Sequence, residues 1–176
     1  MSCKPCEWIE KSELIYEDEQ VVALMADKPA NFGHVIVMPK QHFTILEQVP
    51  DKIISHIGVV ANKISIALFE SLNIQGTNIL IHNGVVAHQQ YPHFMVHIIP
   101  RLENDGIELA WKSRQLSEEE MSTIELELTE GVKTEKAVIK TETPSQDSLK
   151  QGKKETEKLK QSNQTNYLIR QLERIP

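Results

Sequence analysis

Cysteine is scarce in this chain, and long apolar runs are absent. Only two of its 176 residues are cysteine, Cys3 and Cys6, so a disulfide-stapled secreted domain is excluded and a reducing compartment is expected. No uninterrupted apolar run approaches the ~18 residues that span a bilayer. The first residues lack the apolar segment of a secretory signal. We therefore expect a cytoplasmic protein without membrane contact.

The net charge of −6 conceals two parts of opposite sign. Residues 1–132 hold 9 Lys and Arg against 19 Asp and Glu, a net charge of −10. Residues 133–176 hold 10 against 6, a net charge of +4. An acidic body argues against nucleic-acid binding by the core. The basic tail could lie on its own acidic body or bind another anion.

Length and the spacing of apolar residues predict a single domain with an appendage. Residues 50–72 carry apolar side chains at intervals of three and four, which predicts an amphipathic helix with Pro50 at its start. Ser117 and the three glutamates after it predict the capped start of a second helix. Apolar runs bounded by turn residues predict five strands, at residues 13–17, 21–26, 34–38, 77–82 and 93–99.

The chain after residue 132 has a different composition from the domain at 1–132. Residues 133–165 are polar and rich in Lys, Ser, Thr and Gln, so we expect a linker that is disordered in part. Residues 166–176 are expected to form a C-terminal helix with one apolar face, made of Tyr167, Leu168, Leu172 and Ile175. Such a face is expected to dock on the protein's own dimer or on an unknown partner.

The segment from Tyr91 to Arg101 reads Y-P-H-F-M-V-H-I-I-P-R. Alternation along a strand would place His93, Met95 and His97 on one face. Imidazoles in that arrangement suit metal binding or phosphoryl chemistry, whereas a thioether has no proton to move and is a poor nucleophile toward phosphorus. A pair of surface histidines on a half-buried strand is the simpler interpretation, and these residues alone leave both open.

The motifs around this segment resemble the histidine triad (HIT) superfamily of nucleotide hydrolases and nucleotidyl transferases. Three motifs follow in the family's order: G-H-V-I-V-M-P-K-Q-H from Gly33, N-G-V-V-A-H-Q from Asn83, and the strand that ends in I-I-P-R. The resemblance extends from about Cys3 to Leu128. It implies an α+β fold, with a five-stranded antiparallel sheet, a long helix and a C-terminal helix. It also implies a homodimer with a continuous ten-stranded sheet.

Cys3 and Cys6 form a C-x-x-C pair, which by itself is compatible with redox activity, zinc binding or no role. The resemblance to the zinc-binding members of the family implies that His42 and His93 complete a zinc site, because all four ligand positions are occupied by suitable residues. Four protein ligands leave no open coordination position, so the zinc is expected to be structural.

The resemblance also implies a purine nucleotide, or a nucleotide conjugate, as the ligand. His34 and His97 match histidines that lie beside the phosphate in the family, and Gln89 matches a glutamine that hydrogen-bonds phosphate oxygens. The aspartate that usually holds the ribose hydroxyls aligns with Ala26, although the neighbouring Asp27 could serve in its place. The expected nucleotide-binding residues are therefore Asp27, His34, His82, Gln89 and His97.

Three departures from the family pattern concern the chemistry. The middle triad histidine is the nucleophile of the family's phosphoramidases and dinucleoside polyphosphate hydrolases, and in this chain its position is occupied by Met95. The family pattern has an asparagine where this chain has His82, and a glycine where it has His88. We therefore expect a nucleotide-binding protein that has lost the covalent nucleotidyl-histidine hydrolase step. Two alternatives stay open. The first is an active hydrolase or transferase that uses a relocated histidine, His82, with His97 and His34 as further catalytic candidates. The second is a zinc-stabilised interaction module.

Overall fold

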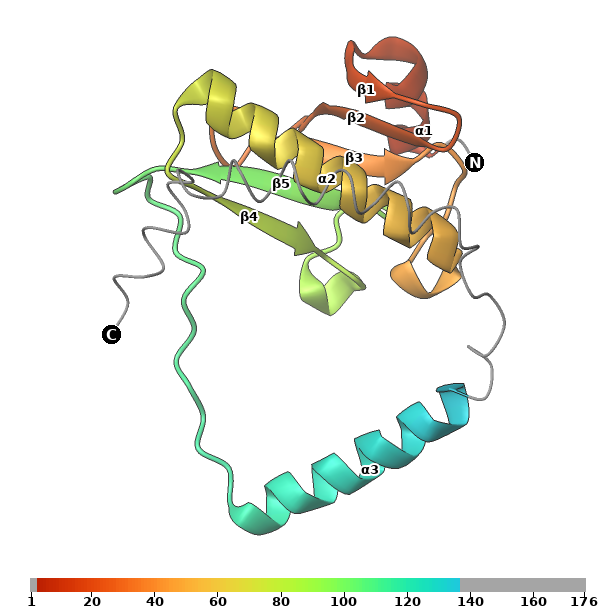
Figure 1. Ribbon diagram of the computed structural model, residues 1–176, viewed down its shortest axis with the longest axis vertical. Coiled ribbons are helices and arrows are strands. Elements are labelled where there is room, and N and C mark those ends of the chain that lie inside the picture. The colour runs from red at the N-terminus through yellow and green to blue at the C-terminus, as the bar shows by residue number, and fades with distance from the viewer. Residues whose placement is uncertain (1–2, 137–176) are drawn as a thin grey trace, which may run out of the picture. The chain divides into compact units, whose positions relative to one another are not determined.

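The structure of the protein is a computed structural model that describes residues 3–136 (Figure 1). One compact unit ends at Ile107 and a second begins at Glu108. The first unit contains, in order, α1 (Lys4–Lys11), β1 (Leu14–Glu17), β2 (Val21–Met25), β3 (Val35–Pro39), a 3-10 turn (Leu46–Gln48), α2 (Asp51–Leu72), β4 (Gly76–Ile81), a second 3-10 turn (Val85–Ala87) and β5 (Val96–Arg101). The second unit contains α3 (Glu118–Lys136).

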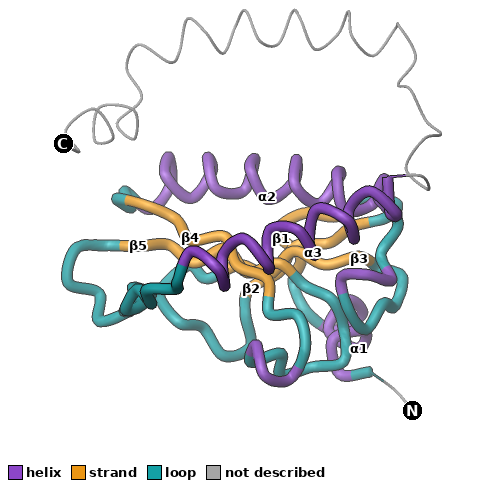
Figure 2. The backbone as a smooth tube through the Cα atoms, turned by 90° about the horizontal axis from the view of Figure 1, so that it is seen from below, coloured by secondary structure: helices purple, strands orange, loops and turns teal. Residues whose placement is uncertain are grey.

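The five strands form one antiparallel sheet in the order β1-β2-β3-β5-β4, which confirms the expected α+β architecture. Its inner strands are apolar on both faces. Val21, Ala23, Val35 and Val37 pack with α2 on one face. On the other face, Val22, Leu24, Ile36 and Met38 pack with Trp8 and Ile9 of α1. Figure 2 accordingly shows α2 on one side of the sheet and α1 on the other.

The expected amphipathic helix is α2, which begins directly after Pro50. Its buried residues recur every three or four positions, as one face of a helix requires: Ile53, Ile57, Val60, Ala61, Ile64 and Leu68. By length and composition α2 is apolar enough to cross a membrane. Because its apolar stripe packs on the sheet, we assign it as the core helix of the domain.

The expected position of the last strand was wrong at both ends. β5 runs from Val96 to Arg101 rather than over residues 93–99, so His93 and Met95 precede the strand. They are held there by other hydrogen bonds, since the His93 N–H donates to Tyr91 O and the next N–H, that of Phe94, donates to Phe43 O. At the far end the strand continues through Pro100. A proline is tolerated there because the ladder with β3 has already ended, and Pro100 pairs only with Thr77 of β4.

The helix α1 was not expected from the sequence. Cys3 occupies its N-cap position and Pro lies in its first turn, where a missing N–H costs no hydrogen bond. Cys6 lies in the same turn. The helix therefore makes the C-x-x-C pair part of a rigid element, with both sulfur atoms at its N-terminal end.

The second expected helix is α3. Its capping box is formed, because the Glu120 N–H donates to Ser117 Oγ at 3.2 Å and the Ser117 N–H donates to Glu120 Oε2 at 2.8 Å. The helix extends to Lys136, past the expected start of the linker at residue 133. The remainder of that linker and the C-terminal helix expected at 166–176 lie outside the described residues.

Gly33 is the glycine on which the fold depends most directly. Its φ is +83°, and a Cβ built there would lie 2.6 Å from Leu72 Cδ1 and 3.3 Å from Pro100 Cγ. We predict that Gly33→Ala lowers the free energy of unfolding by about 1–3 kcal/mol, through backbone strain and overpacking. Gly58→Ala is the matched control, because Gly58 lies inside α2 with open space around it. It should stabilise the protein by up to about 1 kcal/mol. Urea unfolding measures both, and equal midpoints for the two variants would contradict the prediction.

Candidate functional site

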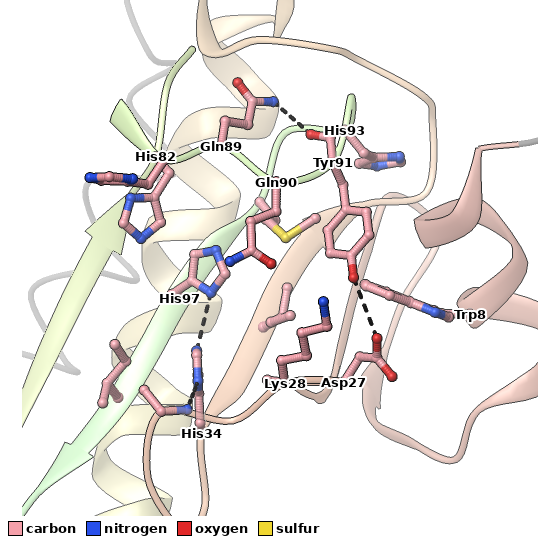
Figure 3. A pocket seen from close by; sticks show the side chains of 16 residues that line it. Trp8, Asp27, Lys28, His34, His82, Gln89, Gln90, Tyr91, His93 and His97 are labelled. Carbon is pink, nitrogen blue, oxygen red and sulfur yellow. Dashed lines mark hydrogen bonds between the residues drawn. The ribbon is translucent and has the colours of Figure 1, made fainter. Parts of the chain in front are cut away.

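A cavity of about 370 Å³ lies on the face of the sheet opposite α2. This volume falls in the range of small-molecule sites in proteins. Figure 3 shows side chains from separate segments converging on it: Trp8 of α1, Asp27 and Lys28 after β2, His34 before β3, His82 after β4, and His97 of β5. All predicted nucleotide-binding residues therefore line one cavity.

His82 and Met95, the position of the family nucleophile, lie at the same end of the β4–β5 ladder. Ile81 pairs with Val96 and Leu80 with His97. His82 follows Ile81 and Met95 precedes Val96, so both lie just beyond the last pair of the ladder, and both line the cavity. Met95 itself is only 7% exposed and packs in the apolar cluster beneath the cavity.

Two histidines form a hydrogen-bonded chain whose proton positions follow from the donors around them. The Ala30 N–H donates to His34 Nδ1 at 3.0 Å, so a neutral His34 carries its proton on Nε2. That Nε2 lies 3.1 Å from His97 Nδ1 and donates to it. His97 consequently carries its own proton on Nε2, which it can offer to a ligand in the cavity.

Both of these histidines stay neutral near pH 7. Burial, followed by the charges of His34 and His82, lowers the pKa of His97 to about 4. Burial is also the main cause that lowers the pKa of His34. His97 is therefore a neutral hydrogen-bond donor to a ligand and not a stored positive charge.

His82 carries its proton on the other ring nitrogen, Nδ1, and not on Nε2 as His34 and His97 do. Its Nδ1 lies 2.7 Å from the carbonyl oxygen of Ala87, which can only accept, so Nδ1 carries the proton. Its Nε2 therefore keeps the lone pair. The His82 and His97 rings are 5.2 Å apart between centroids and inclined at 68°. The cavity thus has an imidazole lone pair and an imidazole N–H side by side.

Gln89 lines the cavity, but its amide is already engaged. Its Nε2 donates to Thr44 O at 2.6 Å and to Tyr91 O at 2.9 Å. Its Oε1 accepts from the Gly84 N–H at 2.7 Å. Both amide protons are used within the protein, so Gln89 could contact a phosphate only after exchanging one of these bonds.

Asp27 lies at one side of the cavity with partners that the motifs did not indicate. Its Oδ2 is 3.3 Å from Lys4 Nζ and 3.4 Å from the Tyr91 hydroxyl, which donates to it. The Lys4 ammonium lies 5.9 Å from the centroid of Trp8 and 5.6 Å from that of Tyr91. Tyr91 and Trp8 make an edge contact at 5.0 Å. Sequence reasoning missed this aromatic wall because α1 itself was not expected.

A second cluster, formed by Cys3, Cys6, His42 and His93, could hold a metal ion. One ligand atom from each residue lies within 4.8 Å of all the others. Cys6 Sγ is 3.4 Å from His93 Nδ1 and 3.5 Å from His42 Nδ1, and Cys3 Sγ is 3.7 Å from His93 Nδ1. Tetrahedral bonds of about 2.3 Å to sulfur and 2.0–2.1 Å to nitrogen require a separation of about 3.6 Å between these atoms. The donor set and its spacing fit a tetrahedral ion.

The hydrogen bond of His93 and the pKa shifts of His93 and Cys6 also fit a metal ion at this cluster. His93 is 0% exposed, and its Nε2 donates to Pro39 O at 3.1 Å, so Nδ1 presents its lone pair to the cluster. Burial lowers the pKa of His93, which keeps the ring neutral. Burial and the neighbouring Cys3 raise the pKa of Cys6 to about 11. Two adjacent thiolates would therefore need a cation between them.

Comparisons with known proteins agree with this geometry. The sequence profile of the HIT domain matches residues 9–104, more than half of the chain. The chain belongs to the HIT family.

An uncharacterized HIT-like protein of Methanocaldococcus jannaschii is 37% identical over 54% of this chain and 73% of its own length. An adenylylsulfatase of Arabidopsis thaliana is 31% identical over 58% of this chain, but this match spans only half of that relative. An adenosine 5′-monophosphoramidase of Saccharomyces cerevisiae is 26% identical over 72% of this chain and 80% of its own length.

Solved structures of HIT proteins share the fold. A HIT family protein of Bacillus anthracis superposes with a TM-score of 0.67 at 34% identity, covering 74% of this chain and 96% of that one. A zinc-bound histidine triad family protein of Mycobacterium smegmatis gives a TM-score of 0.58 at 30% identity, covering 65% and 85%. This chain is therefore related to nucleotide-binding hydrolases of the HIT family.

We predict that the Cys3–Cys6–His42–His93 cluster binds one metal ion and that Cys6→Ser releases it. Protein purified without chelator should hold about one ion per chain, since all four ligands come from one chain. A chelator should lower the melting temperature of the wild-type protein, because metal binding to the native state stabilises it. The same chelator should leave the melting temperature of Cys6→Ser unchanged. Elemental analysis and thermal melting measure these effects, and wild-type protein without metal would contradict the prediction.

Proposed function

We propose that the cavity binds a purine nucleotide or a nucleotide conjugate, with the phosphate beside His97 and His34. The observation that carries this proposal is the directed hydrogen-bond chain from the Ala30 N–H through His34 to His97, which leaves an N–H donor facing a cavity of nucleotide-compatible size. Phosphate oxygens only accept hydrogen bonds, so a fixed donor suits them. The names of two relatives state activity on adenylyl compounds, which supports the same ligand class.

In this proposal Asp27 accepts hydrogen bonds from the ribose hydroxyls, and its bond to Tyr91 opens to allow it. Trp8 and Tyr91 offer an apolar wall for the base. Gln89 contacts the phosphate only through exchange of an existing bond, so its larger role is to hold the loop around the cavity.

We further propose that position 95 no longer supplies the nucleophile of the covalent hydrolase step. The thioether of Met95 packs with Val22, Leu24, Ile36 and Met38. It has no ionisable proton. It can therefore neither form a stable nucleotidyl intermediate nor act as an acid or base. Met95 instead closes the apolar floor of the cavity.

The ion in the Cys3–Cys6–His42–His93 cluster is proposed to be zinc. Two thiolates and two imidazoles are the ligand set of many structural zinc sites, and an intact set of four leaves no position for substrate. The zinc would hold α1 against the segment before β5 through Cys6 and His93, and so keep Trp8 at the cavity.

Nucleotide-dependent melting tests the proposed binding. AMP or GMP at about 100 times the dissociation constant should raise the free energy of unfolding by about 2.7 kcal/mol. His97→Ala should reduce this rise, because it removes the N–H that faces the phosphate. Val59→Ala, an exposed change on α2, should keep the full rise. No rise in the wild-type protein at millimolar nucleotide would favour the zinc-stabilised interaction module instead.

We also infer a homodimer that pairs through the β4 edge of the sheet. Within the described residues β4 pairs with β5 alone, and its Ile79 and Ile81 are 50% and 42% exposed. Both lie on the same face as Thr77, whose hydroxyl contacts Ser65 of α2 at 2.9 Å, so the exposed surface continues onto α2. An apolar edge strand of this kind is a template for pairing with a second copy.

Sedimentation of two charge-introducing variants tests this interface. Ile79→Lys should convert the dimer into monomers, because it places a charge in the proposed contact. Ile15→Lys is the matched control at the opposite edge of the sheet, on β1, where Ile15 is equally exposed at 50%. It should stay dimeric. Dissociation by Ile15→Lys alone would assign the contact to β1 and contradict the inference.

A further inference from the structure

The cavity contains two neighbouring histidines, one of which offers a hydrogen-bond donor and the other a lone pair. His97 offers an N–H, and His82 offers a lone pair on Nε2, because Nδ1 of His82 is committed to Ala87 O. Their ring centroids are 5.2 Å apart, close enough for both to contact one phosphoryl group. His82 and Met95 both lie just beyond the last pair of the β4–β5 ladder, that of Ile81 with Val96, and both line the cavity.

We propose that His82 Nε2 is the nucleophile of this site and attacks the phosphorus of the bound nucleotide, forming a nucleotidyl-His82 intermediate. The inference rests on the proposed nucleotide binding and adds a catalytic residue to it. A lone pair on the free ring nitrogen is what attack on phosphorus requires, and covalent catalysis divides one difficult displacement into two easier ones.

The loop between β4 and β5 is built to hold His82 in this state. The Ala87 N–H and the Gln89 N–H both donate to Gly84 O, at 3.1 Å each. Gln89 Oε1 accepts from the Gly84 N–H and closes the same turn from the other side. These bonds fix the Ala87 carbonyl that accepts from His82 Nδ1. The carbonyl also stabilises the positive charge that the ring acquires on attack. The engaged amide of Gln89 thus has a positioning role.

The first step forms the Nε2–P bond and breaks the bond from phosphorus to the leaving group, whose electron pair departs with it. His97 donates its Nε2–H to a phosphoryl oxygen and keeps the proton, since losing it would leave an imidazolate. No acid beside the leaving group is therefore supplied by these histidines. The site favours leaving groups that are stable as anions, as in nucleoside 5′-phosphosulfates, over amines that need a proton on departure.

The second step returns the site to its starting state. Water attacks the phosphorus, the P–O bond forms, and the P–N bond breaks with its electron pair returning to His82 Nε2. The proton of the water goes to solvent. For adenosine 5′-phosphosulfate the balance is the substrate dianion plus water giving the AMP monoanion, sulfate and one proton.

Mass analysis of the full-length, metal-loaded protein tests the proposal. The protein is mixed with adenosine 5′-phosphosulfate and denatured at alkaline pH, because phosphorus–nitrogen bonds to imidazole are labile in acid. We expect a mass gain of one adenylyl group, mapped to the peptide that contains His82. His82→Ala should lose the adduct and reduce sulfate release on the order of 10³-fold or more. The phosphoramidate of AMP should react more slowly than the phosphosulfate.

Two controls separate loss of the nucleophile from loss of the pocket. His82→Ala should still show a melting shift with AMP, smaller by the one contact that it removes, although it forms no adduct. His56→Gln, a change on α2 outside the cavity, should retain both the full shift and the adduct. In the double variant His82→Ala/Met95→His an imidazole returns at position 95, and we expect an adduct there. Unchanged turnover in His82→Ala, or an adduct mapped to another residue of the wild-type protein, would overturn the inference while leaving nucleotide binding intact. No AMP-dependent shift in the wild-type protein would overturn the proposed function and this inference with it.

Discussion

The pairing of β5 with both of its neighbours is the constraint on which the sites of this protein depend. β5 lies between β3 and β4, and its backbone hydrogen bonds set the register of both. The ladder with β3 brings His34 to the side of His97. The ladder with β4 brings His82 to the other side of His97. A shift of one residue in either ladder would turn the side chains of that strand to the other face of the sheet and dismantle the cavity.

The segment before β5 connects the metal-binding cluster to the cavity. His93 is directed at Cys3 and Cys6, whereas Met95 two residues later closes the cavity floor and His97 lines its wall. A metal ion bound by His93 and by α1 would therefore also set the position of Trp8. Metal binding and ligand binding would therefore be coupled through this short segment, although the two sets of ligating atoms are separate.

Hydrogen-bond direction, more than residue identity, decides what each histidine can do. His34 and His97 are the same residue type and share one hydrogen bond, but only the order in which they donate leaves the N–H of His97 for a ligand. His82 differs because a carbonyl oxygen holds its Nδ1–H. Gln89 shows the same principle, since a residue that could have faced a phosphate is used to hold the turn that orients His82.

Sequence periodicity and motif order were sufficient for the α+β class, the five antiparallel strands, the helix α2 and the family. These features follow from local spacing of apolar residues and turns, which the chain carries in short stretches. The C-x-x-C pair and the two histidines of the metal-binding cluster could also be named in advance, through the family pattern. The start of β5 and the helix α1 could not, because hydrogen bonds to Phe43 and packing against the sheet decide them. The tertiary structure alone decided that His82 lies beside His97 with its Nδ1 held by the Ala87 carbonyl, since strand pairing and the local turn determine where an imidazole lies and which nitrogen carries its proton.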